Sequence, residues 1–301
     1  LIEGAEPGPP RRSARGRYAT FLGATMSIHH LNCTTMRPFA FVLSGTGSFV
    51  SRSHLVVHCL LIESNDGLVL VDTGFGTRDF IRPSKPVRTF MFLSGTRRDV
   101  RDTAVHQVAK LGYDVRDVRH IVLTHLHLDH AGGLPDFPWA KVHVHALEYE
   151  TVMRSGAFSG RYYRFEHWAH GPEWVLHSCQ GERWFDFECI RVMERVLPEI
   201  LFIPMPGHTR GHCGVAVETK EGWLLHCGDG YIFRGEVKPK YGRGSRPGWM
   251  EPLARRLFPH VPRLRELARN RGREVRLFCS HDAFELSEFQ ASTQVAEEQA
   301  A

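Results

Sequence analysis

Six residues of this chain, 125–130, read His-Leu-His-Leu-Asp-His and follow the apolar run Ile121-Val122-Leu123. Three imidazoles and one carboxylate are costly to bury beside a strand unless a cation compensates them. Neutral imidazole and carboxylate oxygen are ligands that suit zinc. The alternatives are a solvated turn or an ordinary core histidine, and 19 histidines in 301 residues make chance pairs common. A chance His-x-His-x-Asp-His before Ala131-Gly132-Gly133 is not expected, so the pattern predicts a metal site.

Further residues of metal-ligand type follow three other apolar runs. His208 and His212 come after the run 201–204, Asp229 follows 223–227, and His281 follows 275–279. Functional residues are commonly carried on loops that a rigid sheet holds in place. We therefore expect four strand ends to deliver these side chains to one site.

The predicted elements do not alternate regularly between strand and helix. Asn65-Asp66-Gly67 predicts a hairpin between two early strands. Two sheets packed face to face, with helices on their outer faces, fit this order better than a doubly wound sheet. Strands are expected at 58–63, 68–71, 121–123, 141–145, 201–204, 214–218, 223–227 and 275–279, and helices at 98–111 and 262–271.

The chain divides into a short leading stretch and one predicted domain. Residues 1–25, rich in Pro and Arg, are expected to be a disordered tail, an artificial leader or an upstream extension, and 26–301 a single domain. An aromatic-rich insert occupies the region around 153–188. Its rings either fill a covering subdomain or form a lid that gives the site an apolar wall; both interpretations stay open.

Composition narrows the expected partners and location. The formal net charge of +5 is mild, so solvated arginines explain it better than a nucleic-acid surface does. No apolar run is long enough for a transmembrane helix, and no export signal is visible. Seven cysteines without a C-x-x-C pair agree with reduced thiols. We expect a cytoplasmic protein that acts on a small molecule, without nucleic acid or membrane, and a homodimer stays open.

Taken together, the motifs resemble those of the metallo-β-lactamase superfamily over roughly residues 55–282, and Val71-Asp72-Thr73-Gly74 also matches. The resemblance implies an α/β fold, an αββα sandwich of two mixed sheets flanked by helices, with a two-metal cleft along one sheet edge. Two Zn²⁺ ions are the default cofactors, although iron, manganese or cobalt suits the same ligands. The implied ligands are His125, His127 and His208 for one ion, Asp129, His130 and His281 for the other, and Asp229 as a bridge.

The resemblance also implies a mechanism. A hydroxide shared by the two ions attacks the substrate carbonyl, while the ions stabilise charge on the reacting oxygens. Asp129 handles a proton as a catalytic residue. Asp72 is expected to accept an N–H from a histidine ligand, with a turn-capping aspartate as the alternative, and His212 to lie outside the ligand set.

Within the superfamily, the chain is most similar to N-acyl-homoserine lactonases. The evidence is the 125–133 motif, Pro206-Gly207-His208-Thr209-x-Gly211-His212, and the 21 residues from His208 to Asp229 (229 − 208). Two features depart from that group. His130 and His208 are 78 residues apart (208 − 130), and the usual tyrosine position, three residues past Asp229, is Ile232. Tyr231, one residue earlier, either polarises the ring oxygen as a catalytic residue or simply packs.

The predicted function is therefore a dinuclear zinc-dependent hydrolase of a lactone or ester. One alternative is a phosphodiesterase, with Lys238, Lys240, Arg243 and Arg246 gripping phosphate. Another is a different hydrolase of this fold with low β-lactamase activity, although a bridging aspartate argues against a true β-lactamase. A third is a metal-bearing sensor that binds a ligand without turnover. His167 and His170 are considered as substrate-facing groups, and His120 is expected at the surface.

Overall fold

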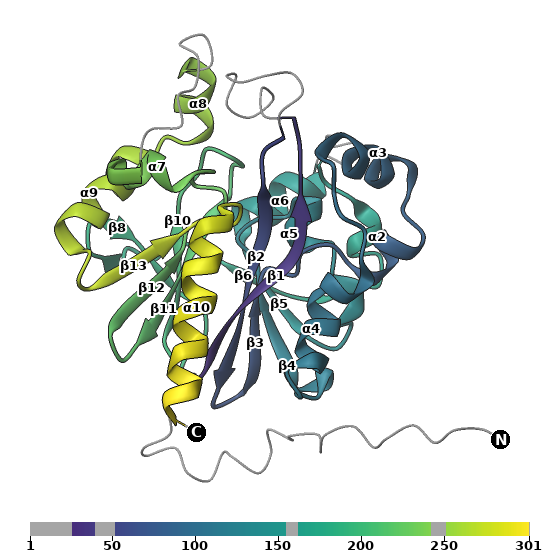
Figure 1. The fold of residues 1–301 in the computed structure, drawn as a ribbon, viewed down its shortest axis with the longest axis horizontal. Coiled ribbons are helices and arrows are strands. Elements are labelled where there is room, and N and C mark those ends of the chain that lie inside the picture. Colours follow the sequence, from purple (N-terminus) through teal and green to yellow (C-terminus); the bar gives the residue numbers. More distant parts are fainter. Residues whose placement is uncertain (1–25, 40–51, 155–161, 242–250, 301) are drawn as a thin grey trace.

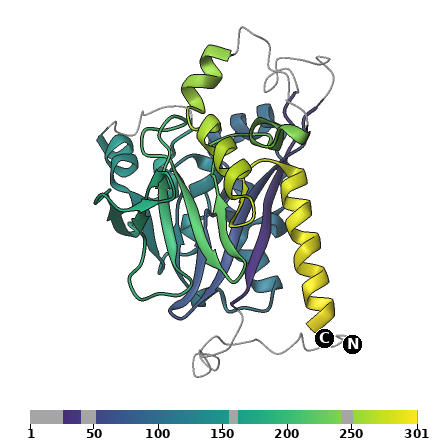
Figure 2. The same ribbon diagram turned by 90° about the vertical axis from the view of Figure 1, so that its left-hand side faces the viewer.

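The computed structural model of this chain describes residues 26–39, 52–154, 162–241 and 251–300, and it shows an αββα sandwich (Figure 1). Two mixed sheets lie face to face, and helices cover their outer faces. Figure 2 shows the same sheets turned by 90°. The predicted fold class is confirmed.

The first sheet contains six strands in chain order. The first three pair antiparallel, and the third to the sixth pair parallel. Because the carboxyl ends of parallel strands meet at one edge, the residues after β3 and β4 lie together. The strands are β1 (Ile28–Met36), β2 (Leu55–Ser64), β3 (Gly67–Val71), β4 (Val118–Val122), β5 (Lys141–His145) and β6 (Glu173–His177).

The second sheet has the strand order β13-β12-β11-β10-β9. It contains β9 (Ile190–Arg191), β10 (Ile200–Pro204), β11 (Cys213–Thr219), β12 (Gly222–His226) and β13 (Val275–Phe278). β10 and β12 both pair antiparallel with β11, and β12 pairs parallel with β13. The loops after β10, β12 and β13 therefore leave this sheet at one common edge. A separate hairpin joins β7 (Arg183–Trp184) to β8 (Phe187–Glu188).

Alternating side chains along the strands build separate layers of the core. In β2, Leu61 packs with the helical layer of the first sheet, whereas Leu60 and Ile62 face the second sheet and pack with Phe202 and Val215. This two-residue period is what a strand between two apolar layers requires. The apolar side chains between the two sheets therefore hold the sheets face to face.

Helices cover both outer faces. The first sheet carries α2 (Thr77–Ile81), α3 (Lys85–Ser94), α4 (Ala104–Lys110), α5 (Leu128–Ala131) and α6 (Ala146–Arg154). Among the later helices are α7 (Arg234–Val237), α8 (Glu251–Leu257), α9 (Val261–Arg271) and α10 (Ala283–Ala300). In Figure 1, α10 crosses in front of the region where the two sheets meet. Short 3₁₀ turns occur at Val100–Asp102, Val115–Asp117, Leu134–Asp136, Phe165–His167 and Pro239–Tyr241.

Most predicted elements are found, with one clear correction. The helix expected at 98–111 is split into a 3₁₀ turn, Val100–Asp102, and α4. Thr103 has an extended backbone, which interrupts the helix at this residue. Its hydroxyl donates to the Val100 carbonyl. Strands β1 and β6 and helices α2, α3, α6 and α10 were not predicted.

Some sequence predictions fall outside the described residues. These are the leading stretch 1–25, part of the aromatic-rich insert (155–161), and Arg243 and Arg246. Within the insert, β6 forms the edge of the first sheet, so part of it belongs to the sandwich itself. The boundaries of the single domain stay predictions. In the part of the chain that the structure describes, no helix has the length and hydropathy needed to cross a membrane.

Candidate metal centre

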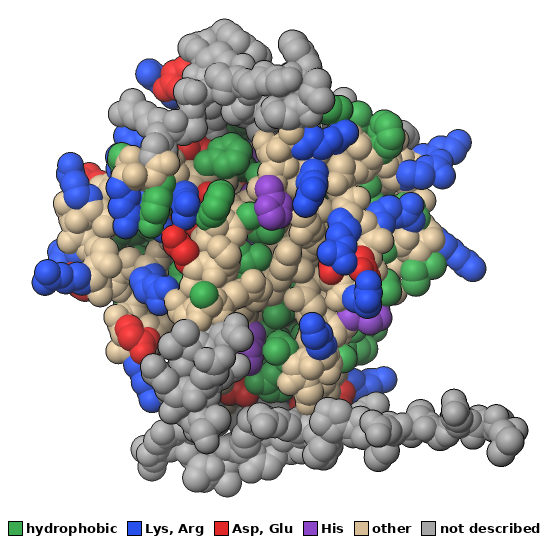
Figure 3. Space-filling model, viewed as in Figure 1, with side chains coloured by type: hydrophobic (Ala, Val, Ile, Leu, Met, Phe, Trp, Pro, Cys, Tyr) green, Lys and Arg blue, Asp and Glu red, His purple; other side chains and the backbone are tan. Residues whose placement is uncertain are grey.

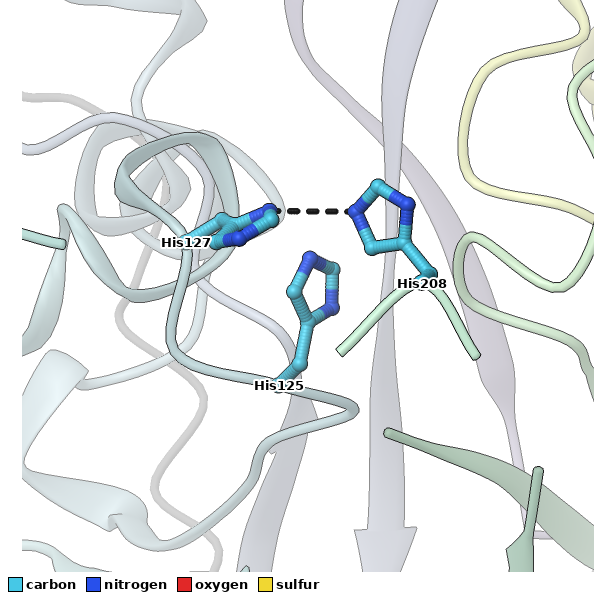
Figure 4. Close-up of side chains that lie close together, drawn as sticks. All are labelled: His125, His127 and His208. Atoms are coloured by element: carbon cyan, nitrogen blue, oxygen red, sulfur yellow. Dashed lines mark hydrogen bonds between the residues drawn. The ribbon is translucent and has the colours of Figure 1, made fainter. Parts of the chain in front are cut away.

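All seven predicted metal ligands lie together at the common edge of the two sheets. His125, His127 and His208 form one group whose ligand-type atoms lie within 4.8 Å of one another. Figure 4 shows their three rings facing one another, with His127 Nδ1 and His208 Nε2 3.0 Å apart. His125 and His127 follow β4, and His208 follows β10, so the two sheets contribute jointly to this group.

A second group, Asp129, His130 and His281, lies beside the first and meets the same 4.8 Å limit. Asp229 lies between the two groups. Its Oδ1 is 3.3 Å from His130 Nε2 and 3.2 Å from His281 Nε2, and its Oδ2 is 3.2 Å from His208 Nε2 and 3.3 Å from His281 Nε2. One carboxylate therefore reaches both groups, as a bridging ligand must.

The chemistry of this donor set fits metal ions. Among the described residues, His125 Nε2, His130 Nε2 and Asp229 Oδ1 are buried without a hydrogen-bond partner. Buried polar atoms normally have partners, so a cluster of unpartnered ones needs an explanation. Divalent cations bound to imidazole and carboxylate supply one, and the three residues form a further group within the 4.8 Å limit.

In three of the candidate histidine ligands, the Nδ1 atom contacts an oxygen on the side of the ring away from the centre. His130 Nδ1 lies 2.8 Å from Asp72 Oδ2, and His281 Nδ1 lies 2.8 Å from the Val56 carbonyl oxygen. His125 Nδ1 lies 3.0 Å from the Thr124 hydroxyl. These contacts leave each Nε2 turned toward the centre, which is the usual arrangement of histidine ligands.

Asp72, at the end of β3, connects this arrangement to the first sheet. Its Oδ1 accepts from the Thr124 amide at 2.8 Å, and its Oδ2 accepts from the Thr124 hydroxyl at 2.8 Å as well as from His130. The expectation that Asp72 accepts an N–H from a histidine of this set is confirmed, and the turn-capping alternative is wrong.

Two glycines after α5 allow the ligand helix to lie close to β3. A Cβ at Gly132 would lie 2.7 Å from Asp79 Oδ2 and 2.9 Å from the Gly74 carbonyl oxygen. A Cβ at Gly133 would lie 2.8 Å from the Thr73 carbonyl oxygen. Both glycines have negative φ, so space rather than backbone conformation requires glycine here.

Two histidines hold the backbone of the turn that presents Asp229. The Asp229 amide donates to His212 Nε2 at 3.0 Å, and the Gly228 amide donates to His226 Nδ1 at 3.0 Å. Burial lowers the pKa of both imidazoles, which keeps them neutral and able to accept. His212 thus lies behind Asp229, whereas the role of His226 carries no sequence signal beyond its place at a strand end.

Electrostatics separate the histidines into two kinds. Burial, followed by neighbouring imidazoles, lowers the pKa of His125 and His127 well below its usual value, so both are neutral. Burial also opposes charge on His130, but Asp229 and further carboxylates outweigh it and raise its pKa. Burial would raise the pKa of Asp229, yet His281 and other imidazoles hold it well below the usual value. Asp229 is therefore ionised, as a bridging ligand requires.

Tyr231 is placed for packing rather than catalysis. Its side chain is fully buried among the apolar residues outside the second sheet, and its hydroxyl donates to the Glu285 carboxylate at 3.0 Å. A phenol committed to a partner in that layer is turned away from a substrate beside the histidines. The catalytic interpretation of Tyr231 is therefore corrected to the packing one.

Three further expectations are also corrected. His120 is buried, not at the surface, and it contacts His143 within the first sheet. His167 is buried and paired with Asp79 at 3.0 Å rather than facing substrate.

The third concerns Lys238 of the predicted phosphate-gripping group; Lys240 is exposed, and Arg243 and Arg246 lie outside the described residues. Lys238 donates to the Leu277 carbonyl and to Glu285, so its ammonium is turned inward and is not free to grip phosphate.

Aromatic side chains lie directly against one of the candidate ligands. The rings of Tyr162 and Tyr163 have centroids 5.0 Å and 4.9 Å from that of His127. Phe90 contacts Tyr162 edge-on at 5.9 Å. The Leu128 amide donates to the Tyr162 carbonyl, which ties this part of the insert to α5. Tyr162 remains 42% exposed, so it offers an apolar surface beside the candidate site.

Comparisons with known proteins agree with this architecture. Residues 53–238 match the family model described as the metallo-beta-lactamase superfamily. A probable metallo-hydrolase from Mycobacterium tuberculosis is 37% identical, over 91% of this chain and 89% of its own length. An N-acyl homoserine lactonase from a Bacillus species is 27% identical, over 56% of this chain and 60% of its own length.

A solved structure extends the similarity to three dimensions. It is an N-acyl homoserine lactone hydrolase with the product N-hexanoyl-L-homoserine bound at its catalytic metal centre. It superposes with a TM-score of 0.65 at 20% identity, covering 88% of this chain and 97% of that one. At this identity the similarity concerns the fold alone.

Proposed function

This chain belongs to the metallo-β-lactamase superfamily and is a metal-dependent hydrolase, and we propose that it uses two zinc ions to hydrolyse lactones or related esters. The observation that carries the proposal is Asp229, whose carboxylate lies within 3.3 Å of His208 of one group and of His130 and His281 of the other. A carboxylate in that position is what two ions of a dinuclear centre require.

We propose that the ligands divide as the superfamily resemblance implies. His125, His127 and His208 would hold one ion, Asp129, His130 and His281 the other, with Asp229 between them. When bound, such a pair would lower the pKa of a water toward neutrality and so supply a hydroxide nucleophile for a carbonyl carbon at neutral pH. Imidazole and carboxylate ligands make zinc the default, and other divalent transition metals suit the same atoms.

The chain's own groups would orient the substrate and handle protons. Asp129 Oδ2 lies 3.8 Å from His281 Nε2, beside the other proposed ligands. We propose that its carboxylate would carry a proton between the attacking water and the leaving group. Tyr162 and Tyr163 would provide an apolar wall for an acyl chain. This proposal combines both interpretations of the aromatic-rich insert, whose described rings would pack and also line the site.

The lactonase relatives favour lactones over phosphodiesters. The phosphodiesterase alternative loses support because Lys238 is engaged in the interior. In Figure 3, Lys and Arg side chains are scattered across the described part of the visible face, with Asp and Glu side chains among them. We therefore propose a small-molecule substrate rather than nucleic acid; the cytoplasmic location and a homodimer also stay proposals.

Metal content and substrate preference test the proposal together. We expect about two zinc ions per metal-loaded chain and faster hydrolysis of N-acyl homoserine lactones than of a chromogenic phosphodiester or nitrocefin. Asp229→Ala should lower the zinc content, and it should lower zinc affinity and turnover by more than the roughly 10–100-fold seen when only a ligand's orienting partner is lost. The exposed His54 gives a matched control, His54→Ala, which should change neither.

Two results would overturn the proposal. One is a folded, metal-loaded protein that hydrolyses the phosphodiester or nitrocefin but no lactone or ester. The other is an Asp229→Ala variant with normal zinc content and normal turnover.

A further inference from the structure

Glu148, in helix α6, is a fully buried carboxylate outside the set of proposed ligands. No basic side chain is among the partners described for it, and burial raises its pKa. A buried carboxylate without a cationic partner is costly, so the hydrogen bonds it accepts must serve a purpose. Those bonds all come from segments around the candidate metal centre.

The two oxygens of Glu148 hold two different loops. Oε1 accepts from the Leu126 amide at 3.0 Å, and Leu126 lies between His125 and His127. The same oxygen accepts a longer hydrogen bond, 3.4 Å, from the Tyr163 hydroxyl. Oε2 accepts from the Thr209 hydroxyl at 2.7 Å and from the Gly211 amide at 3.1 Å, directly after His208. The loops that carry the three histidines of one group are thus joined through a single side chain.

The chemistry of these donors demands a carboxylate. Backbone amides can only donate, and one of them points at each oxygen of Glu148. Glutamine offers a single acceptor oxygen and would turn its own N–H₂ toward one of the amides. Aspartate is one methylene shorter and cannot reach both loops from the same backbone position.

Close packing strengthens the connection. A Cβ at Gly211 would overlap the backbone of Glu148, so the loop after His208 rests directly on α6. A second tie, from the Cys213 amide to the Thr124 carbonyl at 2.9 Å, joins the same two segments at their bases. Because this second tie is independent of Glu148, losing the carboxylate should loosen the loops without separating the sheets.

We propose that Glu148 is a positioning residue that sets the spacing of His125, His127 and His208 by joining the two loops that carry them. The inference rests on the proposed metal site. It assigns a purpose to a side chain that contacts neither the substrate nor, on this geometry, a metal ion.

Zinc affinity of folded, metal-free protein tests the proposal without any activity measurement. Glu148→Gln should weaken binding of one of the two ions by roughly 10–100-fold, as loss of an orienting partner typically does, and leave the other close to normal. Competition with a chromophoric chelator gives both affinities, and circular dichroism checks folding. The matched control is Glu150→Gln, on the same helix, with a side chain 48% exposed and paired to Arg154; it should change neither affinity.

A second variant keeps the test decisive if Glu148→Gln fails to fold. Thr209→Val removes one hydrogen bond to Glu148 and preserves shape, so it should weaken the same ion by a smaller factor. Normal affinity for both ions in folded Glu148→Gln, or in Thr209→Val where the first variant is unfolded, would overturn the inference. Equal loss of both ions would overturn it too. Failure of the unsubstituted protein to bind zinc would instead defeat the proposed function itself, and this inference with it.

Discussion

At the scale of single residues, the candidate site depends on carboxylates that are each shared between partners. Asp72 accepts from Thr124 and His130, Asp229 lies between two groups of imidazoles, and Glu148 joins two loops. Each carboxylate is buried. Hydrogen-bond donors contact both oxygens of Asp72 and Glu148, and imidazoles of the proposed metal site contact both oxygens of Asp229. Removing a single acceptor from such a set leaves a buried donor without a hydrogen bond. This loss costs more stability than one hydrogen bond normally contributes.

Asp72→Asn makes this cost measurable. The amide group of Asn must face either the Thr124 amide or the His130 ring, so one donor loses its acceptor. We expect zinc affinity or turnover to fall roughly 10–100-fold, measured by chelator competition and by lactone hydrolysis. Asp66→Asn makes the same chemical change on a side chain that is 50% exposed and should leave both quantities near normal. Equal effects of the two substitutions would contradict the role assigned to Asp72.

At the scale of elements, the ligands come from the ends of strands and from one short helix. α5 has only four residues, Leu128–Ala131, which is too short to be stable by itself. Its position depends on outside contacts: the Thr73 amide donates to the His130 carbonyl, and Gly132 lies against Asp79 and Gly74. The helix therefore takes its place from β3 and α2 rather than from its own sequence.

Gly132→Ala tests that dependence. The added methyl would overlap Asp79 and the Gly74 carbonyl, so we expect unfolding free energy to fall by about 1–3 kcal/mol. Zinc affinity should fall as well, because α5 carries Asp129 and His130.

The control separates strain from site geometry. Gly112 has φ of +85°, and no described atom lies within 4 Å of an added Cβ. Gly112→Ala should cost about 1–2 kcal/mol of stability through backbone strain while leaving zinc affinity unchanged. Urea unfolding and chelator competition give the two quantities; unchanged zinc affinity in Gly132→Ala would refute the packing argument.

At the scale of the whole molecule, the interior holds many more histidines than the candidate site uses. One line of them crosses the first sheet: His120 contacts His143 at 3.0 Å, and His143 contacts His177 at 3.0 Å, from β4, β5 and β6. Asp66 accepts at the other end, 3.2 Å from His120. Burial, followed by the charges of His120, His177 and Lys141, lowers the pKa of His143 from 6.5 to about 3.

This lowered pKa predicts acid sensitivity. Above pH 6.5 His143 is neutral in both states; between about 3 and 6.5 only the unfolded chain binds the proton. Unfolding free energy should therefore fall as the pH drops through that window, by up to about 1.4 kcal/mol per pH unit for this residue. Urea unfolding of metal-free protein at pH 7 and pH 5 measures the slope. It should be smaller in His143→Gln and normal in His54→Gln, and identical slopes in all three proteins would disprove the assignment.

The sequence by itself predicted the fold class and the identity of the seven clustered side chains. The strand periodicity and the residues of metal-ligand type are local information, whereas the αββα cleft and the choice of these seven ligands followed from the resemblance to the metallo-β-lactamase superfamily. Helices α3 and α10 were missed; α10 packs against β1 and β2, which lie far from it in the chain, so no local pattern records that packing. The split before α4 was missed because the apolar spacing from Val100 to Leu111 continues through Thr103, where the backbone is extended.

Tertiary structure decided the residues whose roles depend on distant partners. Tyr231 changes from a candidate catalyst to a packed side chain because Glu285 accepts its hydroxyl, and Lys238 turns inward toward the same carboxylate. Glu148 and His226 carry no motif, yet both hold loops of the candidate site. A hydrogen bond between segments far apart in the chain leaves no periodicity or spacing in the sequence, so only the folded arrangement reveals which polar groups are satisfied and which face the metal centre.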